Sequence, residues 1–271
     1  MSFLPPRREF LATALATSAA ATMGMAALPQ LATAETEAGA KPQVYELWIY
    51  QMASGGMVGR AHEYFQHALL PALGRAGTGP VGVFLESGKT GTSAIYVLIP
   101  LAGIEAVAAV STALVADAAY QTAGASFLSA SPKDPAYTNV EARLMAAAEF
   151  MPQLEVPEKK ASRIFELRRY RSPSEAAFHK KLEMFATSEL AIFRRVGLNP
   201  VFFGKTLFGP DMFNITYMLT YPDADAHGRA WGKFGGDHDW QKLRVTPGYT
   251  DAEIIANIKS TMLKPADYSQ I

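Results

Sequence analysis

Two stretches of the chain alternate between apolar and polar side chains with a period of two residues. Residues 44–50 read VYELWIY, and residues 164–170 read IFELRRY. Alternation with this period is typical of half-buried β-strands. A serine follows each stretch, Ser54 or Ser174, where its hydroxyl can cap the first turn of a helix. The pattern therefore predicts a strand followed by a helix at both places.

The two stretches belong to a longer internal repeat. Glu46 and Glu166 lie 120 residues apart, and identical residues recur at that offset without gaps. One constant offset over such a length indicates a duplicated unit. Further identical pairs are Ser54/Ser174, Glu63/Glu183, Phe65/Phe185, Leu70/Leu190, Arg75/Arg195, Gly77/Gly197, Pro80/Pro200, Ile95/Ile215 and Asp117/Asp237.

Each repeat is predicted to follow the order β-α-β-β-α-β. The helix after the first strand should end at Gly77 or Gly197, because glycine favours the left-handed backbone that stops a helix. This order is that of a ferredoxin-like unit, so we expect an α+β chain with two tandem ferredoxin-like repeats, at 42–150 and 161–271. The other predicted elements are strands 81–86, 94–99 and 137–144 with a helix at 103–120, and strands 201–206, 214–221 and 254–263 with a helix at 223–243.

Strand alternation also divides each first strand into two faces. We expect Tyr45, Leu47 and Ile49 to lie under the helices, because they form the more aliphatic set. The other face of such a sheet carries no helices and needs a cover. Two sheets in one chain can cover each other by closing a barrel, or pairing between chains can do so, as in a homo-oligomer. The candidate ligand-binding residues on this predicted interior face are Glu46, Trp48, Tyr50, Glu166, Arg168 and Tyr170.

Overall composition narrows the function classes. The chain has 271 residues, 49% of them hydrophobic, and a formal net charge of zero, so it lacks the basic surface that nucleic acids or anionic membranes attract. The absence of cysteine excludes disulfides, thiolate metal sites and cysteine nucleophiles. His62 and His67 are five apart and do not share a helix face, so we expect no metal and no cofactor.

The N-terminus carries an export pattern. Arg7 and Arg8 precede Phe-Leu and a mildly apolar stretch at 11–27, and Ala32-Thr33-Ala34 offers a small-residue cleavage site. Residues 1–34 therefore resemble a twin-arginine signal peptide, which predicts a periplasmic protein cleaved after Ala34. A retained membrane anchor is the alternative, although the stretch is shorter than the about 20 residues that span a bilayer. After cleavage we expect no stable membrane insertion.

Two glycine-containing segments look like phosphate loops but lack the required spacing. The segment 87–90 reads SGKT, yet position 83 is valine where that motif needs glycine, and a predicted strand follows it. The segment 55–60 reads GGMVGR, which we interpret as a flexible loop rather than a dinucleotide-binding turn.

Six segments carry the pattern of a known family: Tyr45 to Leu47, Phe165 to Tyr170, Ile192 to Leu198, Pro200 to Gly204, Trp231 to Phe234 and Asn257 to Ile271. Together they resemble the NIPSNAP family, more closely in the second half than in the first. The resemblance implies the dimeric α/β-barrel type of fold, which small monooxygenases and other ligand-binding barrels share. It carries no catalytic motif onto this chain.

Three functions remain open on the sequence. The leading hypothesis is that a small, partly apolar molecule binds in the barrel interior, where aromatic residues surround a few polar groups. One alternative is a metal-free enzyme of the small α/β-barrel monooxygenase or isomerase kind, with Glu46 or Glu166 as its base. The other is a structural or interaction protein, in which Arg168 simply pairs with these carboxylates.

Overall fold

The computed structural model describes residues 41–87 and 94–271, which belong to one compact unit. The predicted signal peptide at 1–34 and most of the SGKT segment lie outside the described residues.

The first half of the described chain contains four strands and a set of short helices. The strands are β1 (Val44–Gln51), β2 (Gly82–Glu86), β3 (Ile95–Leu101) and β4 (Asn139–Ala147). The helices are α1 (Gly55–Tyr64), the π-helix η1 (Phe65–Leu69), α2 (Leu70–Arg75), α3 (Glu105–Ala116), α4 (Ala118–Ala123) and α5 (Ala125–Leu128).

The second half has the same order of elements. Its strands are β5 (Ile164–Arg171), β6 (Asn199–Phe208), β7 (Asn214–Tyr221) and β8 (Asn257–Pro265). Its helices are α6 (Glu175–Met184), the π-helix η2 (Phe185–Glu189), α7 (Leu190–Val196), α8 (Ala224–Gly236), α9 (His238–Leu243) and α10 (Asp251–Ile254).

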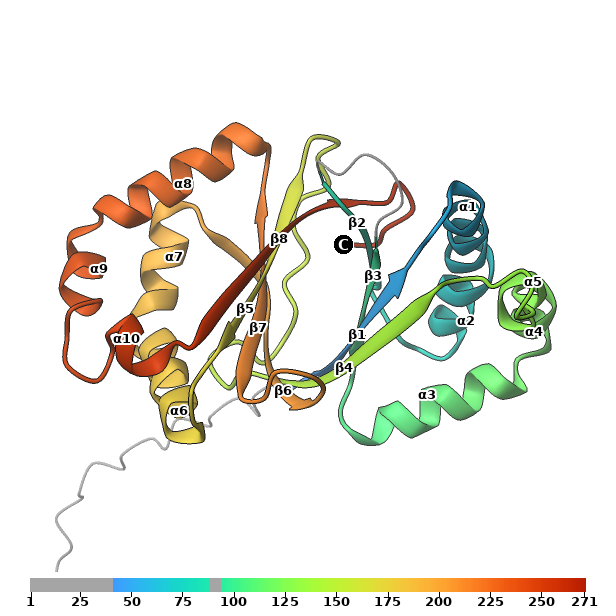
Figure 1. The fold of residues 1–271 in the computed structure, drawn as a ribbon, viewed down its shortest axis with the longest axis horizontal. Coiled ribbons are helices and arrows are strands. Elements are labelled where there is room, and N and C mark those ends of the chain that lie inside the picture. Colours follow the sequence, from blue (N-terminus) through green and yellow to red (C-terminus); the bar gives the residue numbers. More distant parts are fainter. Residues whose placement is uncertain (1–40, 88–93) are drawn as a thin grey trace, which may run out of the picture. The chain divides into compact units, whose positions relative to one another are not determined.

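The eight strands form one closed barrel in the order β1-β3-β2-β8-β5-β7-β6-β4. All neighbouring strands are antiparallel, and β2 with β8 and β4 with β6 join the two halves. Within each half the order is the same, β4-β1-β3-β2 and β8-β5-β7-β6. Figure 1 shows helices α1–α5 on one side of the barrel and α6–α10 on the opposite side. The barrel therefore closes within a single chain and is flanked by two helical layers.

The barrel interior is filled with apolar side chains. Tyr45, Leu47 and Ile49 point into it, where they pack with residues such as Phe165 and Phe202. An eight-stranded barrel encloses only enough space for its own side chains, so its interior selects the more aliphatic set of each strand.

The predicted faces of the first strand are therefore reversed. We expected Tyr45, Leu47 and Ile49 under the helices, but Trp48 and Tyr50 are the residues that pack against the helical layer. The six candidate residues lie on the helix-facing side of their strands, outside the barrel.

The helices begin where their capping residues predict. The Ser54 hydroxyl accepts a hydrogen bond from the Met57 amide at 3.3 Å, and that of Ser174 accepts one from the Ala177 amide at 3.2 Å. Helix α1 starts at Gly55. The interpretation of segment 55–60 as a flexible loop is therefore wrong, because a well-capped first turn accommodates its glycines.

One ion pair occurs at the same place in both helical layers. The Arg75 guanidinium lies 2.6 Å from the Asp117 carboxylate, and the Arg195 guanidinium lies 2.9 Å from that of Asp237. Each aspartate also caps a short helix, and it interrupts the longer helix that we predicted through its position.

Candidate functional site

A polar cluster lies between the sheet and the helices in the second half, and Glu166 is its centre. This residue of β5 is 3% exposed, and its two carboxylate oxygens accept five hydrogen bonds. The donors are Trp231 Nε1 at 2.8 Å, Tyr221 Oη at 3.0 Å, His227 Nε2 at 3.2 Å, Ser260 Oγ at 2.6 Å and the Arg168 guanidinium.

Arg168 is equally well surrounded. Its guanidinium pairs with Glu166 and donates to the Tyr217 and Tyr170 hydroxyls at 3.0 and 2.9 Å. Its Cζ atom lies 4.4 Å from the centroid of the Trp231 ring, which places the cation over an aromatic face. The predicted partnership of Arg168 with Glu166 is therefore confirmed.

Both charges of this pair are held in their ionised forms. Burial opposes ionisation of Glu166, but the Arg168 charge and the hydrogen bonds from Ser260 and Trp231 outweigh it and lower its pKa. Burial likewise opposes the charge on Arg168, yet the Tyr217 and Tyr170 hydroxyls and Glu166 raise its pKa. A carboxylate with a lowered pKa and five donors is a poor general base, so the cluster is better explained as packing.

The first half keeps the carboxylate but not its partners. Glu46 occupies the place of Glu166, since both pair with the equivalent positions of the neighbouring strands. At the places of the donors Arg168, Tyr221, His227, Trp231 and Ser260, the first half has Trp48, Leu101, Val107, Ser111 and Ala142. Of these five, the Trp48 indole is the one that still donates to Glu46, at 2.9 Å.

A cavity of about 310 Å³ lies beside Glu46, and three of these five residues, Trp48, Val107 and Ser111, line it. It lies between the sheet and helix α3, which contributes Val107, Val110, Ser111 and Leu114 to its wall. The other lining residues are Glu46, Trp48, Tyr50, Tyr64, Leu69, Leu73, Val97, Ile99 and Tyr120.

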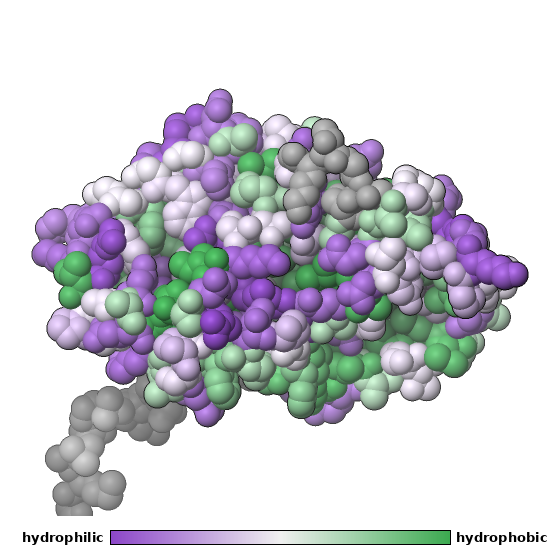
Figure 2. All heavy atoms as spheres, in the orientation of Figure 1, coloured by the Kyte–Doolittle hydropathy of each residue, from purple (hydrophilic) through white to green (hydrophobic). Residues whose placement is uncertain are grey.

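Helix α3 covers this cavity without closing onto the sheet. None of its residues is fully buried, although Glu105 is its only charged residue. Figure 2 shows hydrophobic surface over α3, in the lower right of the view. In the other layer, the matching helix α8 buries Ala230 and Phe234. Val107, Val110 and Leu114 of α3 still pack partly against the core of this layer, so the helix forms one wall of the cavity.

The polar groups of the cavity are few. Glu46 is the only charged residue among those that line it. The Tyr64 and Tyr120 hydroxyls lie 2.7 Å apart and share a hydrogen bond. Burial raises the pKa of Tyr50 and Tyr64 well above the ordinary value, so these phenols stay protonated at physiological pH.

The six candidate residues thus fall into two separate places. Glu46, Trp48 and Tyr50 line the cavity, whereas Glu166, Arg168 and Tyr170 belong to the packed cluster of the other half. Sequence reasoning missed His227, which contacts Glu166, and it missed the helix residues that wall the cavity. The sequence does contain a signal for the cavity: at the 120-residue offset, Trp231 of the second repeat matches the much smaller Ser111 of the first.

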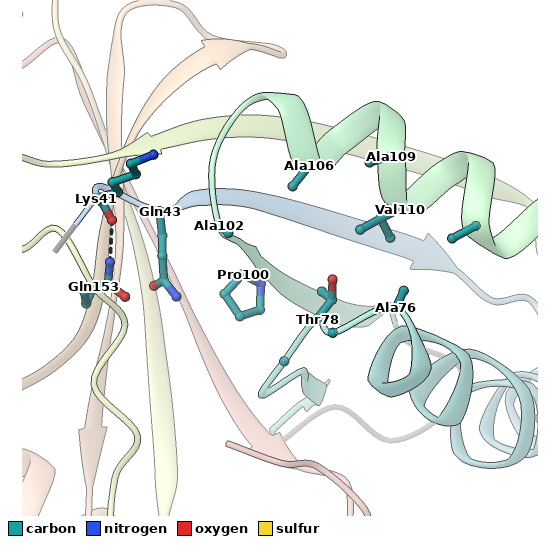
Figure 3. Close-up of a pocket in the computed structure, with 13 residues that line it drawn as sticks. Lys41, Gln43, Ala76, Thr78, Pro100, Ala102, Ala106, Ala109, Val110 and Gln153 are labelled. Carbon is teal, nitrogen blue, oxygen red and sulfur yellow. Dashed lines mark hydrogen bonds between the residues drawn. The ribbon is translucent and has the colours of Figure 1, made fainter.

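A second cavity, of about 500 Å³, lies on another side of α3. Figure 3 shows Ala106, Ala109 and Val110 of this helix facing Ala76 and Thr78 across it. Small side chains and backbone line most of this space, and it contains no carboxylate. Its polar side chains are those of Lys41, Gln43, Thr78 and Gln153, and both glutamines already hydrogen-bond to backbone groups.

Residues 41–87 and 94–271 contain no group of three or more His, Asp or Glu side chains placed to hold a metal ion. Within the same residues, no helix combines the length and apolar character that crossing a membrane requires.

These observations define a mixed α/β protein with an eight-stranded closed antiparallel barrel and helices on both sides. Residues 165–270 match the NIPSNAP family model. No curated protein matches the chain.

The solved structures with a similar fold include two candidate monooxygenases. The one from Fusobacterium nucleatum is 8% identical with a TM-score of 0.56, and the match covers 83% of this chain and 93% of that one. The one from Lactobacillus acidophilus is 9% identical with a TM-score of 0.52, covering 83% and 94%. A NIPSNAP family protein from Agrobacterium tumefaciens is 21% identical with a TM-score of 0.37, covering 44% of this chain and 98% of that one.

Proposed function

We propose that this protein binds a small, partly apolar molecule in the cavity between the β1–β3 sheet and helix α3. The observation that carries the proposal is the difference between the two halves. Glu166 lies in a tightly packed cluster, whereas Glu46, at the same place in the fold, faces a cavity of about 310 Å³. The barrel interior, where we first expected the ligand, is occupied by side chains.

The composition of the cavity supports this proposal. Its volume lies at the lower end of the roughly 300–1,000 Å³ typical of ligand sites, and such sites combine an apolar wall with a few placed polar groups. Here the wall is aliphatic and aromatic, and the polar groups besides the paired Tyr64 and Tyr120 hydroxyls are the Glu46 carboxylate, the Tyr50 hydroxyl and the Ser111 hydroxyl. Neither hydroxyl has a hydrogen-bond partner among the described residues, so both can contact a bound molecule.

The proposal extends to organisation and location. We propose that the two halves are tandem ferredoxin-like repeats, at 42–150 and 161–271, because their strand orders and their Arg–Asp ion pairs correspond. We also propose a NIPSNAP-like first half, diverged to form the cavity, and export to the periplasm through the signal at residues 1–34.

A cavity-filling substitution tests the binding site. Ser111→Trp introduces the side chain that the second half carries at that place, and it should fill the cavity while the protein still folds. The probe is neopentylbenzene, a neutral apolar molecule, and its binding is measured by saturation-transfer NMR. We expect binding to the natural sequence and none to Ser111→Trp.

The matched control places the same indole outside the cavity. Val115 is on the same helix and is 73% exposed, so Val115→Trp should leave probe binding unchanged. Equal binding to the natural sequence and to a folded Ser111→Trp would place the site elsewhere. The proposal would be overturned if the natural sequence bound neither this probe nor a charged probe of the same shape.

A further inference from the structure

The electrostatic character of the cavity at Glu46 restricts what it can bind. One carboxylate lines it, and no Lys, Arg or His side chain does. In the other half, the matching carboxylate is balanced by the Arg168 guanidinium, but the residue at that place in the first half is Trp48. The exchange of a cation for an indole leaves the Glu46 charge without a counter-ion from the cavity wall.

Aromatic side chains surround this charge. Glu46, Trp48 and Tyr50 alternate along β1 and form one row, in which the Trp48 and Tyr50 rings lie 6.3 Å apart and nearly parallel at 19°. Tyr64 and Tyr120 line the same space from the helical layer. Aromatic faces carry negative electrostatic potential and attract cations, and indole does so most strongly.

We infer that the ligand of this cavity is an organic ammonium ion with an apolar body. This inference rests on the proposed binding function and adds the class of molecule. The positive group would lie against Glu46 and the Trp48 and Tyr50 rings, and the apolar part would lie against the aliphatic residues of α3. The Trp48 indole already donates to Glu46, so it holds the carboxylate in place while the ligand supplies the missing positive charge.

Other ligand classes fit the cavity less well. A carboxylate or phosphate would lie near Glu46 with no basic side chain among the lining residues to offset the repulsion. A neutral apolar molecule would fill the space but leave a half-buried carboxylate without a counter-charge. An ammonium ion satisfies both the charge and the aromatic wall.

Two probes of the same shape test the inference. Benzyltrimethylammonium and neopentylbenzene differ in one atom, nitrogen against carbon, and therefore in charge. The dissociation constant of each is measured on the full protein by titration with saturation-transfer NMR. We expect the cation to bind at least about tenfold more tightly than the neutral probe, because cation–π attraction and the Glu46 carboxylate both favour a positive charge.

Glu46→Gln removes the charge and keeps an oxygen that can accept from Trp48. We expect this variant to bind the cation about tenfold more weakly, with the affinity for the neutral probe unchanged. Glu105→Gln is the matched control, since it removes an exposed carboxylate at the start of α3, outside the cavity lining, and should change neither affinity.

The outcomes separate this inference from the function on which it rests. If the neutral probe binds as tightly as the cation, the ammonium inference is overturned and binding of an apolar molecule stands. If the cation binds preferentially but equally well to a folded Glu46→Gln, its site is not at this carboxylate and the inference is also wrong. If neither probe binds the natural sequence, the proposed binding function fails as well.

Discussion

The buried pair of Glu166 and Arg168 allows a sharp test of what holds the second half together. We expect Arg168→Met alone to destabilise the protein more than Arg168→Met combined with Glu166→Gln. The single change leaves a carboxylate that is 3% exposed without its ion pair. Removing one partner of a buried pair typically costs about 3–5 kcal/mol, whereas replacing both by neutral groups of similar volume is often close to neutral.

The contacts of Glu166 set the expected cost of each variant. After Arg168→Met, four other donors still reach the carboxylate, so we expect the lower end, about 3 kcal/mol. In the double variant, the amide oxygen of the introduced glutamine can take the position that accepts from Trp231 and Tyr221. The NH₂ group of this glutamine then faces Ser260, whose hydroxyl can accept. We therefore expect the double variant to lose only about 1 kcal/mol.

Urea denaturation measures these free energies of unfolding, with unchanged m-values as the check on two-state behaviour. A loss of about 3 kcal/mol corresponds to a fall in Tm of roughly 6–12 °C for a protein of this size. Because the folded-state pKa of Glu166 is lowered, its ionisation stabilises the protein above the unfolded pKa, and this contribution disappears as pH falls through the folded pKa. When the solution is acidified, the Arg168→Met variant should therefore unfold at a higher pH than the natural sequence. A double variant as unstable as the single one would refute the ion-pair reasoning.

Two further predictions concern other parts of the chain. Lys181 and Glu189 form a pair at 2.6 Å with both side chains 1% exposed, so Glu189→Leu alone should cost about 3–5 kcal/mol, and Glu189→Leu with Lys181→Met should cost clearly less in the same urea assay. Arg7→Lys with Arg8→Lys should retain the precursor in the cytoplasm in a folded state, as measured by cell fractionation, and an unchanged periplasmic yield would contradict the twin-arginine assignment.

Much of the element order could be predicted from local patterns. Strand alternation located β1 and β5, and the serine caps located the helices that follow them. The helix breaks were harder. We predicted one continuous helix through Asp117 and another through Asp237, but each aspartate adopts an extended backbone and caps the next helix instead. The same carboxylate also pairs with a distant arginine, a tertiary contact that local propensity does not contain.

Alternation alone could not say which face of a strand points inward. It separated Tyr45, Leu47 and Ile49 from Trp48 and Tyr50, and that separation is correct. Deciding which set faces inward requires knowing that the sheet closes into a barrel. The barrel interior is drier and more tightly packed than the space between the sheet and the helices. Both sets of β1 contain aromatic residues, so hydrophobicity gave too little contrast to decide between them.

The separation of the two helical layers explains how one half can contain a cavity while the other is filled. The apolar core under α1–α5 and the core under α6–α10 lie on opposite sides of the barrel, and a third core fills the interior between them. Trp231 in the second layer and Ser111 in the first occupy matching places. The difference between them therefore changes one layer without disturbing the other.

The Arg75–Asp117 ion pair of the first layer does not involve the positions that carry His227 and Trp231 in the second layer. Helix α3 is held at its end by Asp117, which pairs with Arg75, and neither of these residues lines the cavity. Its middle can consequently stand away from the sheet, above Glu46, while its end stays attached. A layer built in this way can contain a cavity where bulky side chains are absent, because the Arg75–Asp117 pair that holds α3 does not involve them.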